Sequence, residues 1–476
     1  MISTRRLLAF LALRPIANSA YQFPRNLYKS IGFSSFCKTF MTDSSSSSGS
    51  PVLDREVFNS EFELIALKIP AKQCTNFLKT FKNYLWERPR MKKILNIDGE
   101  DDNRLLLLSK DKIKSDIDIP IDLKDFITSY NGIITSHNMK LGYENLTVDE
   151  VLKYYFPERD DTPGAFEQVG HLAHMNLRPE YLSYKHIIGQ VIIDKLPHIK
   201  TVVNKLGNID TKYRTFPMEL LAGDDNYNVS LRESGAKFTF DFRSVYWNSR
   251  LQMEHFRLIK IIRDSAVSTS SSKKTIVADL MCGIGPFAIP LAMGGLVVHA
   301  NDLNPASYEY LLKNSQQNKC TSKLIPYNLD ARAFVLDLVE NDIGFDHAPM
   351  NLPQTATDFL DIFIGLKTRY KDSTNYRVPR IHVYAFATAD DVIDDVRQRC
   401  AKIMRIKEEE LPSSAVKGHI VRDVAPKKLM VCLSFDLPDI VADSEPLSLD
   451  ELQIVSSNRG KHLRDDGDDV VSSNKK

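Results

Sequence analysis

Four turns in the C-terminal half of the chain place acidic, amide and glycine residues directly after short apolar segments. These segments and their turns are "TIVADLMCGIGP", "LVVHANDL", "LIPYNLDA" and "FDHAPMNLP". The residues of interest in them are Asp279, Gly283, Gly285, Asp302, Leu303, Asp330, Ala331, Asn351 and Pro353. Glycine lets a ligand approach the backbone closely, and carboxylates accept hydrogen bonds from hydroxyl and amino groups. If the fold brings the four turns together, they predict one ligand site.

The elements around these turns are expected to bring them together. Each apolar segment is followed by a helical pattern, and "RIHVYAFA" and the alternating "LMVCLSFDL" add later strands. Strands that alternate with helices predict a doubly wound parallel sheet, so the fold class is α/β. Ligands of such sheets bind beyond the carboxyl ends of the strands, which is where all four turns lie.

The glycine turn by itself fits a dinucleotide equally well. Three features favour another ligand. Ala288 stands where the dinucleotide fingerprint has its third glycine, and Pro286 lacks an N–H that could face a pyrophosphate. Asp330 is a second acid at the end of a strand, whereas the dinucleotide fingerprint requires only one.

An S-adenosylmethionine site uses every part of the pattern. Asp302, with Leu303 beside it, would accept from the ribose hydroxyls, and Asp330 would accept from the adenine amine next to the Ala331 backbone. The turn from Asp279 to Gly285 would hold the methionine portion. As an alternative, Asp302 and Asp330 are helix N-caps, since both precede helical segments. We interpret the joint pattern as a cofactor site.

The turn "NLP" predicts a second function, which is to hold the atom that receives the methyl group. In amino-methylating members of this fold, a short Asn/Asp-Pro-Pro-like turn after the fourth strand holds the target nitrogen against the methyl donor. Asn351 offers an amide to a base edge, and Pro353 stiffens the loop. Leu352 replaces one proline of the usual turn.

Upstream of the glycine turn, "SRLQMEHFRLIKII" predicts a helix that Asn248 or Ser249 would cap, and "KFTFDF" predicts a strand. Glu254 in that helix could form an i,i+4 ion pair with Arg250. His171 and His174 are three residues apart, but no suitably spaced third ligand follows, so we expect structural histidines and no metal.

A basic run, "LKTFKNYLWERPRMKKIL", lies near the start of the body of the chain. It is either a solvated amphipathic helix or a patch that faces phosphates, with Tyr84 and Trp86 nearby. The basic residues of this run are Lys79, Lys82, Arg88, Arg90, Lys92 and Lys93.

The N-terminal 41 residues differ from the rest in charge. They contain six basic residues and no acid, so the net charge of +1 becomes −5 for the remainder. An Arg-rich, acid-free start predicts a mitochondrial presequence, with a secretory signal as the alternative. A second start at Met41 would give a form without this address, in the cytoplasm and nucleus. The six cysteines form no CxxC pair, and no apolar run approaches the ~20 residues of a membrane span, so we expect a reduced protein with no membrane partner.

Seven ordered blocks of the chain resemble the eukaryotic and archaeal tRNA (guanine-37, N1)-methyltransferases over roughly residues 52 to 440. The blocks are "GHLAHMNLR", "IKTVVNKLGNI", "YRTF", "VYWNSRLQMEH", "DLMCGIGPFAIP", "NLPQTA" and "HIVRDVAPKKLMVCLSFDLP". The resemblance implies a class I (Rossmann-like) methyltransferase domain with two smaller α+β N-terminal domains, S-adenosylmethionine as cofactor, and tRNA with G at position 37 as partner. We expect a monomer, since nothing in the sequence suggests an obligate dimer.

The resemblance also implies roles for individual residues. Glu254 matches the general base and Arg214 the cation that stabilises O6 of the guanine. Tyr246, Asn351 and Pro353 match the target pocket, and His255 falls where the family contacts the cofactor.

Methylation at guanine N1 needs these roles on chemical grounds, because N1 carries a proton that a base must remove while negative charge develops on O6. Two alternatives remain. One is a sister transferase that moves the aminocarboxypropyl group of the same cofactor to a modified guanosine. The other is a tRNA-binding protein with a degenerate cofactor pocket.

We therefore divide the chain into six parts. They are a presequence (1–41), a disordered linker (42–51), an N-terminal domain that contacts the tRNA elbow (52–123), a middle domain (124–264), a cofactor-binding methyltransferase domain (265–440) and a disordered tail (441–476).

Overall fold

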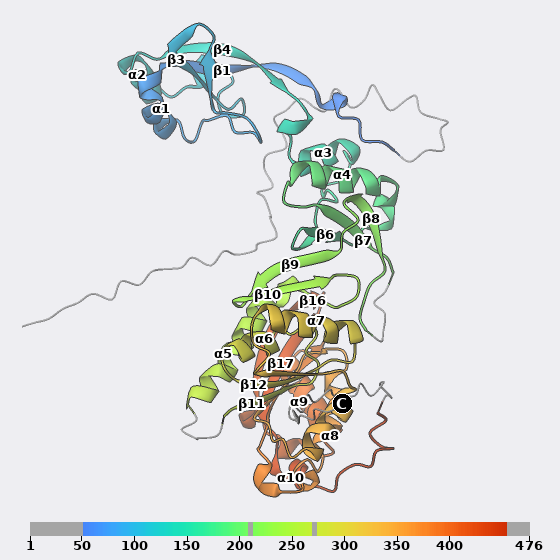
Figure 1. The fold of residues 1–476 in the computed structure, drawn as a ribbon. Helices are drawn as coiled ribbons and strands as arrows, with labels where there is room; N and C mark the ends of the chain where they lie inside the picture. The colour runs from blue at the N-terminus through green and yellow to red at the C-terminus, as the bar shows by residue number, and fades with distance from the viewer. Residues whose placement is uncertain (1–50, 208–212, 269–273, 455–476) are drawn as a thin grey trace, which may run out of the picture. The chain divides into compact units, whose positions relative to one another are not determined.

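The computed structural model describes residues 51–207, 213–268 and 274–454 (Figure 1). The expected presequence, nearly all of the expected linker and residues 455–476 lie outside these ranges. The chain divides into two compact units, one ending at Leu146 and the other beginning at Thr147.

The first unit is a four-stranded antiparallel sheet with strand order β2-β3-β1-β4 and two helices. Its elements are β1 Ser60–Pro70, α1 Cys74–Thr80, β2 Ile94–Ile97, β3 Glu100–Leu107, α2 Ile121–Ser129 and β4 Ile133–Leu141. Phe77 and Phe81 pack with α2 over one face of the sheet, while Trp86 and Met139 pack on the other face. The central strand β1 is therefore buried on both sides.

The predicted end of the first domain at residue 123 is wrong. Strand β4 pairs with β1 along its whole length, from Ser60↔Leu141 to Lys68↔Ile133. Residues 124–146 therefore complete the sheet of the first unit and do not begin a middle domain.

The second unit opens with a small mixed sheet of order β5-β6-β7-β8, followed by the hairpin β9-β10. Its elements are α3 Val148–Tyr155, β5 Glu167–Val169, β6 Leu172–Met175, α4 Lys185–Lys195, β7 Thr201–Lys205, β8 Met218–Gly223, β9 Asn228–Glu233 and β10 Ala236–Asp241. The predicted strand "KFTFDF" corresponds to β10.

A seven-stranded sheet of order β13-β12-β11-β14-β15-β17-β16 forms the rest of the second unit. Its strands are β11 Ile276–Asp279, β12 Val297–Asn301, β13 Leu324–Tyr327, β14 His347–Met350, β15 Arg380–Ala387, β16 Lys417–Ala425 and β17 Lys428–Asp436. Strands β11 to β15 run parallel, whereas β17 is antiparallel to both β15 and β16. The predicted parallel α/β sheet is confirmed.

Helices cover both faces of this sheet (Figure 1). On one face Leu258 and Ile262 of α5 pack with α6 and α7, and on the other face Phe334 of α8 packs with α9 and α10. The bounds are α5 Gln252–Ser268, α6 Ala288–Met293, α7 Pro305–Gln317, α8 Ala331–Glu340, α9 Val392–Ile403 and α10 Asp439–Ala442. The expected helix after the "NLP" turn is a 3-10 helix, Ala356–Phe363, and the N–H groups of Thr355 and Ala356 at its start both donate to Leu352 O.

The predicted boundary after residue 264 does not match the packing either. Phe238 and Phe240 of the hairpin share a core with Trp247, Leu258 and the strands of the large sheet. The side chain of Asn314 on α7 accepts from the Thr239 N–H at 2.9 Å. The hairpin and α5 therefore belong to the body of the large sheet.

The expectation that residues 441–476 are disordered is wrong for 441–454. Val441, Leu447 and Leu452 are buried against α8, α9 and the 3-10 helix. Gly365 N–H donates to Val441 O at 2.8 Å, and a Cβ on Gly365 would lie 2.6 Å from Pro446. The segment thus packs as part of the domain because its apolar side chains fill that face.

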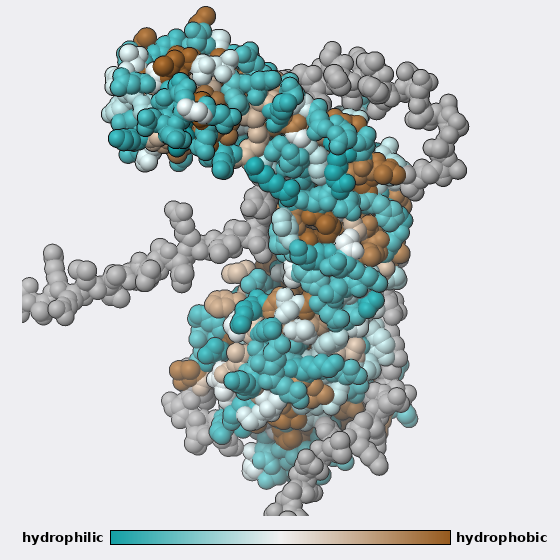
Figure 2. Space-filling view, turned by 45° about the horizontal axis from the view of Figure 1, so that its top comes forward, coloured by the Kyte–Doolittle hydropathy of each residue, from teal (hydrophilic) through white to brown (hydrophobic). Residues whose placement is uncertain are grey.

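Hydrophilic residues cover most of the visible surface, and hydrophobic ones form small separate groups (Figure 2). Across residues 51–207, 213–268 and 274–454, no helix combines the length and the apolar character that a bilayer crossing requires.

Candidate active site

The carboxyl ends of β11, β12, β13 and β14 meet at one edge of the large sheet. Asn301, at the end of β12, is buried, and its side chain forms hydrogen bonds with the turns that follow β11 and β13. Its amide donates to Leu280 O at 3.1 Å and Leu329 O at 3.0 Å, and its Oδ1 accepts from Leu329 N–H at 2.9 Å. Asn301 was not among the residues predicted for the site, although a polar residue inside a buried strand end was a visible signal.

Asp302 fixes the glycine turn. Its Oδ2 accepts from Gly283 N–H at 2.8 Å, and its Oδ1 accepts from Asn304 N–H at 2.9 Å. The desolvation of Asp302 by the surrounding protein raises the pKa of its carboxyl group. The helix cap of α7 is Asn304 and not Asp302. Because a carboxylate has about four acceptor positions, Asp302 can still accept from hydroxyl groups.

The two glycines are required for different reasons. Both have positive φ, +55° for Gly283 and +97° for Gly285. A Cβ on Gly285 would lie 2.8 Å from the side chains of Ile289 and Leu311, whereas a Cβ on Gly283 would meet nothing within 4 Å. Gly285 allows close packing, and Gly283 borders open space that a ligand can enter.

Asp330 is the N-cap of α8, which is the alternative role that its position in the sequence predicted. It is 2% exposed and caps α8 by accepting from Arg332 N–H at 2.9 Å, directly before the buried Ala331. Capping and acceptance from an adenine amine are compatible, since each uses a different acceptor position of the carboxylate.

Asp279 is the clearest sign that the edge holds a cationic ligand. It is fully buried, and neither carboxylate oxygen has a hydrogen-bond partner. The Met281 amide acts on it electrostatically without meeting the geometry of a hydrogen bond. Burial raises the pKa of Asp279 to about 8, and nearby Asp302 adds to the rise. A buried acid without partners is costly unless a ligand completes it, and the α-ammonium of S-adenosylmethionine has the right charge.

Glu254, in the first turn of α5, is held by three side chains. It is 5% exposed. Arg257 donates to both carboxylate oxygens at 2.6 Å, and the hydroxyl of Tyr384 donates to Oε1 at 2.6 Å. His419 Nε2 lies 3.3 Å from Oε2. The expected ion pair between Glu254 and Arg250 is absent from the described residues, because Arg250 pairs with Glu167 on β5 at 2.5 Å.

The partners of Glu254 lie in one row across the sheet. Tyr384 on β15 pairs with Cys432 on β17, which pairs with His419 on β16. Directly paired residues point to the same face of a sheet and lie on strands about 4.8 Å apart. Asn351 follows Met350, the register partner of Val383, so the "NLP" turn continues the row beside Tyr384.

The "NLP" turn is fixed to β15 through the backbone. Phe386 N–H donates to Pro353 O at 3.0 Å. The Oδ1 atom of Asn351 is buried and has no partner, so it is available to a donor on a ligand. The turn thus presents an acceptor at the edge where the cofactor turns meet.

Arg214 and Tyr246, both predicted for the target pocket, lie against each other. The guanidinium of Arg214 lies 5.6 Å from the centre of the Tyr246 ring, which is 38% exposed. Arg214 has a φ of +60°, a conformation that few non-glycine residues adopt. Between Arg214 and Glu254 the described part of the chain has no hydrogen bond or ion pair.

His255 is buried behind the glycine turn. It is 3% exposed, and its Nδ1 lies 2.5 Å from Glu233 Oε1 on β9. Its ring meets Phe287 edge-on at 4.9 Å. His255 therefore packs against Phe287, which directly follows the glycine turn.

The other histidines of interest have ordinary structural contacts. His171 Nε2 lies 3.1 Å from Asn226 O, and His174 stacks on Phe242. Burial lowers the pKa of His174 to about 3. In the three described ranges, no three His, Cys, Asp or Glu residues come together as a metal site would require.

The basic run belongs to the first unit and is not one helix. Helix α1 ends at Thr80, and the remainder forms turns that lead into β2. Trp86 is 6% exposed beneath Arg88, which lies 5.3 Å from its ring, so Trp86 cannot stack on a base. The exposed basic residues are Lys79, Lys82, Arg90, Lys92 and Lys93.

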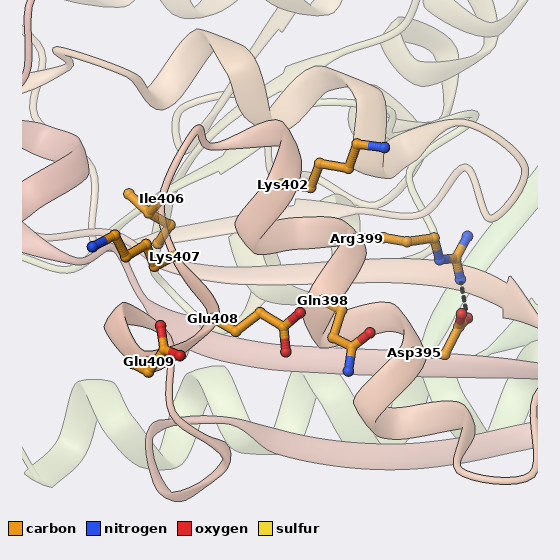
Figure 3. Close-up of a pocket in the computed structure, with 8 residues that line it drawn as sticks. All are labelled: Asp395, Gln398, Arg399, Lys402, Ile406, Lys407, Glu408 and Glu409. Carbon is orange, nitrogen blue, oxygen red and sulfur yellow. Dashed lines mark ion pairs between the residues drawn. The ribbon is translucent and has the colours of Figure 1, made fainter.

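A surface hollow of about 740 Å³ lies along α9 and the loop after it (Figure 3). Its lining carries Arg399, Lys402 and Lys407 but also three acids, and Arg399 pairs with Asp395 at 3.2 Å. The balanced charge gives no preference for a charged ligand. None of the residues predicted for the site lines this hollow.

A Rossmann-like sheet whose carboxyl edge carries a glycine turn, an unpartnered buried acid and a ribose-type acid defines a class I S-adenosylmethionine-dependent transferase. Comparison with known proteins narrows this class. Residues 148–226 match the model of the TYW2 N-terminal domain, and residues 229–410 match that of the TRM5/TYW2 methyltransferase domain.

Relatives with named activities match more than four fifths of the chain. The tRNA (guanine(37)-N(1))-methyltransferase of Phytophthora infestans is 42% identical over 402 residues, which is 83% of this chain and 94% of the relative. The enzyme of that name from Homo sapiens is 34% identical over 82% of this chain and 76% of its own length. The chain belongs to the tRNA (guanine(37)-N(1))-methyltransferase family.

Solved structures share the fold. Trm5b from Pyrococcus abyssi matches 78% of this chain and 99% of its own, with a TM-score of 0.54 and 22% identity. The structure of aTrm5 in complex with tRNALeu matches the same share, with a TM-score of 0.56 and 21% identity. These similarities support the predicted fold class.

Proposed function

We propose that this chain transfers a methyl group from S-adenosylmethionine to N1 of guanosine 37 in tRNA. The observation that carries the proposal is the position of Glu254. This buried carboxylate lies over a row of side chains that leads to Asn351 and the "NLP" turn. The substrate is inferred from the family, and the side chains of the site provide the groups that the reaction needs.

The residues at the sheet edge suit the cofactor. Asp279 would pair with its ammonium group, Asp302 would accept from its ribose, and Asp330 with Ala331 would border its adenine. Leu303 follows Asp302 on the same turn, and His255, whose ring packs on Phe287 just after the glycine turn, would contact the cofactor. The cofactor would supply an electrophilic methyl group on a sulfonium.

The remaining residues would act on the guanine. Glu254 would remove the N1 proton, and Arg214 would stabilise the charge that develops on O6. Asn351 Oδ1 would accept from a donor on the base edge, Pro353 would keep the turn rigid, and Tyr246 would border the base together with Arg214.

The sister reaction, transfer of the aminocarboxypropyl group of the same cofactor, is the alternative that the sequence leaves open. Product analysis separates the two. S-adenosylmethionine labelled with ³H on the methyl group and ¹⁴C on the carboxyl group is incubated with the protein and a tRNA transcript. Methyl transfer places only ³H in the tRNA, and the sister reaction places only ¹⁴C there.

The exposed lysines of the first unit would bind a part of the tRNA that is distant from the reacting base. Lys79→Glu and Lys82→Glu should raise KM with little effect on kcat, and should flatten the salt dependence of binding. An unchanged KM in both variants would remove this surface from the tRNA contact.

Residues 1–41 would direct the protein to the mitochondrial matrix, and a product started at Met41 would stay in the cytoplasm and nucleus. Fusion of residues 1–45 to a fluorescent protein tests this, and a diffuse signal would contradict it. We also propose that the protein acts as a monomer, which light scattering of the purified chain would check.

A further inference from the structure

The acceptor positions of Glu254 are nearly all occupied by donors that keep their protons. A carboxylate has about four such positions. Arg257 takes one on each oxygen, and Tyr384 takes a second one on Oε1. Burial raises the pKa of the Tyr384 hydroxyl well above its usual value, and the bond to Glu254 raises that of Arg257, so neither group gives up a proton at neutral pH. The fourth position, on Oε2, faces His419.

His419 differs from the other partners in exposure and in chemistry. Its side chain is 43% exposed, whereas that of Glu254 is 4% exposed. The distance of 3.3 Å from Nε2 to Oε2 is longer than a normal hydrogen bond, so this position is not firmly closed. Imidazole can donate at either nitrogen or accept at the other, and its charge changes within the physiological range.

The position of His419 links a buried base to solvent. It lies on β16, the outer strand of the sheet, at the end of the row that runs from Tyr384 through Cys432. The titratable groups beside it are Glu254 on α5 and, in the same row of the sheet, Cys432 on β17 and Tyr384 on β15. Burial raises the pKa of Cys432 to about 12, so the thiol does not compete for the proton.

We propose that His419 carries away the proton that Glu254 takes from guanine N1. This inference rests on the proposed role of Glu254. The N1–H bond breaks toward Glu254, and the N1 electron pair forms the bond to the methyl carbon while the sulfur keeps the electrons of the broken S–C bond. The Oε2–H bond then breaks as the Nε2–H bond forms, the imidazolium releases the proton on Nδ1 to water, and proton exchange with solvent returns the neutral ring to the Nδ1–H tautomer whose Nε2 can accept again. Glu254 returns to its charged form without leaving Arg257 or Tyr384.

Two variants of His419 separate proton transfer from support of Glu254. His419→Gln keeps a hydrogen-bond donor beside Oε2 but cannot accept a proton, and His419→Ala leaves space that free imidazole can enter. Methyl transfer to a tRNA transcript is measured with the full chain from pH 5.5 to 8.5. His198→Gln, in the loop before β7, serves as the matched control.

Both variants should lose about a hundredfold in rate, the lower end of what a missing acid–base group costs. Added imidazole should restore His419→Ala in proportion to its neutral form, and it should not restore His419→Gln. Wild-type turnover in His419→Gln would overturn the proposal, because a donor would then suffice. A slow His419→Ala that imidazole leaves unchanged would also overturn it.

The base assignment is judged separately by Glu254→Gln. If Glu254→Gln is slow and His419→Gln is normal, Glu254 is the base and the relay is wrong. If Glu254→Gln is normal, the role of Glu254 in the proposed function is wrong. Thermal melting of each variant and its binding of S-adenosylmethionine show whether the fold is retained.

Discussion

The Tyr384 hydroxyl donates a 2.6 Å hydrogen bond to Glu254 Oε1 across 130 residues of sequence. Both side chains are buried, and the bond joins the first turn of α5 to the strand beside the "NLP" turn. The position of the proposed base therefore depends on the sheet that also positions the target loop. A displacement of this part of the sheet would therefore move both Glu254 and the "NLP" turn.

Replacement of Glu254 by Gln should slow methyl transfer by ~10² or more, because the amide cannot take the N1 proton. Binding of S-adenosylmethionine should persist, since the cofactor turns do not include this residue. Single-turnover rates and calorimetric titration of the cofactor measure the two effects. A rate equal to that of the wild type would remove Glu254 as the base.

Replacement of Arg214 by Ala should cost about 2.7–4 kcal/mol of transition-state stabilisation, the size of a missing oxyanion donor. The effect should fall on kcat with little change in cofactor affinity. Arg243, which is exposed and pairs with Asp241 at 2.7 Å, provides a matched control. If Arg243→Ala and Arg214→Ala had equal small effects, the cation at O6 would have to be sought elsewhere.

Binding of S-adenosylmethionine near pH 7 should release close to one proton. Burial raises the pKa of Asp279 to about 8, so the free protein holds this acid largely protonated, and a cationic ligand requires the carboxylate. Calorimetry in buffers of different ionisation enthalpy counts the protons. Asp279→Asn should abolish the release and weaken binding, and the same proton count in the variant would show that another group is responsible.

The same acid affects stability in the absence of ligand. Because the folded-state pKa of Asp279 is raised, its contribution is present in full below about pH 4, the ordinary pKa of an aspartate, and is lost as pH rises through about 8. The difference in melting temperature between Asp279→Asn and the wild type should therefore shift in favour of the variant as pH rises. A pH-independent difference would contradict the buried, unpartnered state of this carboxyl group.

Substitution of Leu452 by Ala should destabilise the second unit by roughly 2–5 kcal/mol, the usual cost of a cavity in a core. Leu452 is fully buried, whereas Leu449 is 65% exposed three residues earlier. Leu449→Ala should change the free energy of unfolding by less than about 0.5 kcal/mol. Denaturant unfolding of the two variants compares them directly, and equal small losses would show that 441–454 does not pack as described.

Local patterns were sufficient to predict much of the large sheet. The strands that end in Asp279, Asn301 and Met350 are short and apolar, and each is followed by turn residues, so strand, turn and edge could be placed from the sequence. The glycine turn and Asp302 were found for the same reason. The helix that carries Glu254 was correct as well, with Asn248 as the cap of the 3-10 turn that begins it.

The contacts that define the base could not be predicted in this way. Spacing along a helix suggested Arg250 as the partner of Glu254, but Arg250 turns to Glu167 on a neighbouring strand. Tyr384 and His419 reach Glu254 only through the pairing of β15, β17 and β16, which no local pattern encodes. The same cause explains the misplaced boundary at residue 123, since β4 belongs to the first unit only through its pairing with β1.

The most direct test of the account uses two tRNA transcripts that differ only in G or A at position 37. The purified protein is incubated with each transcript and labelled S-adenosylmethionine, and the modified nucleoside is identified by mass spectrometry. The account predicts methyl incorporation into the G37 transcript alone, with N1-methylguanosine as the product. Equal incorporation into both transcripts, or a product methylated at another atom, would contradict it.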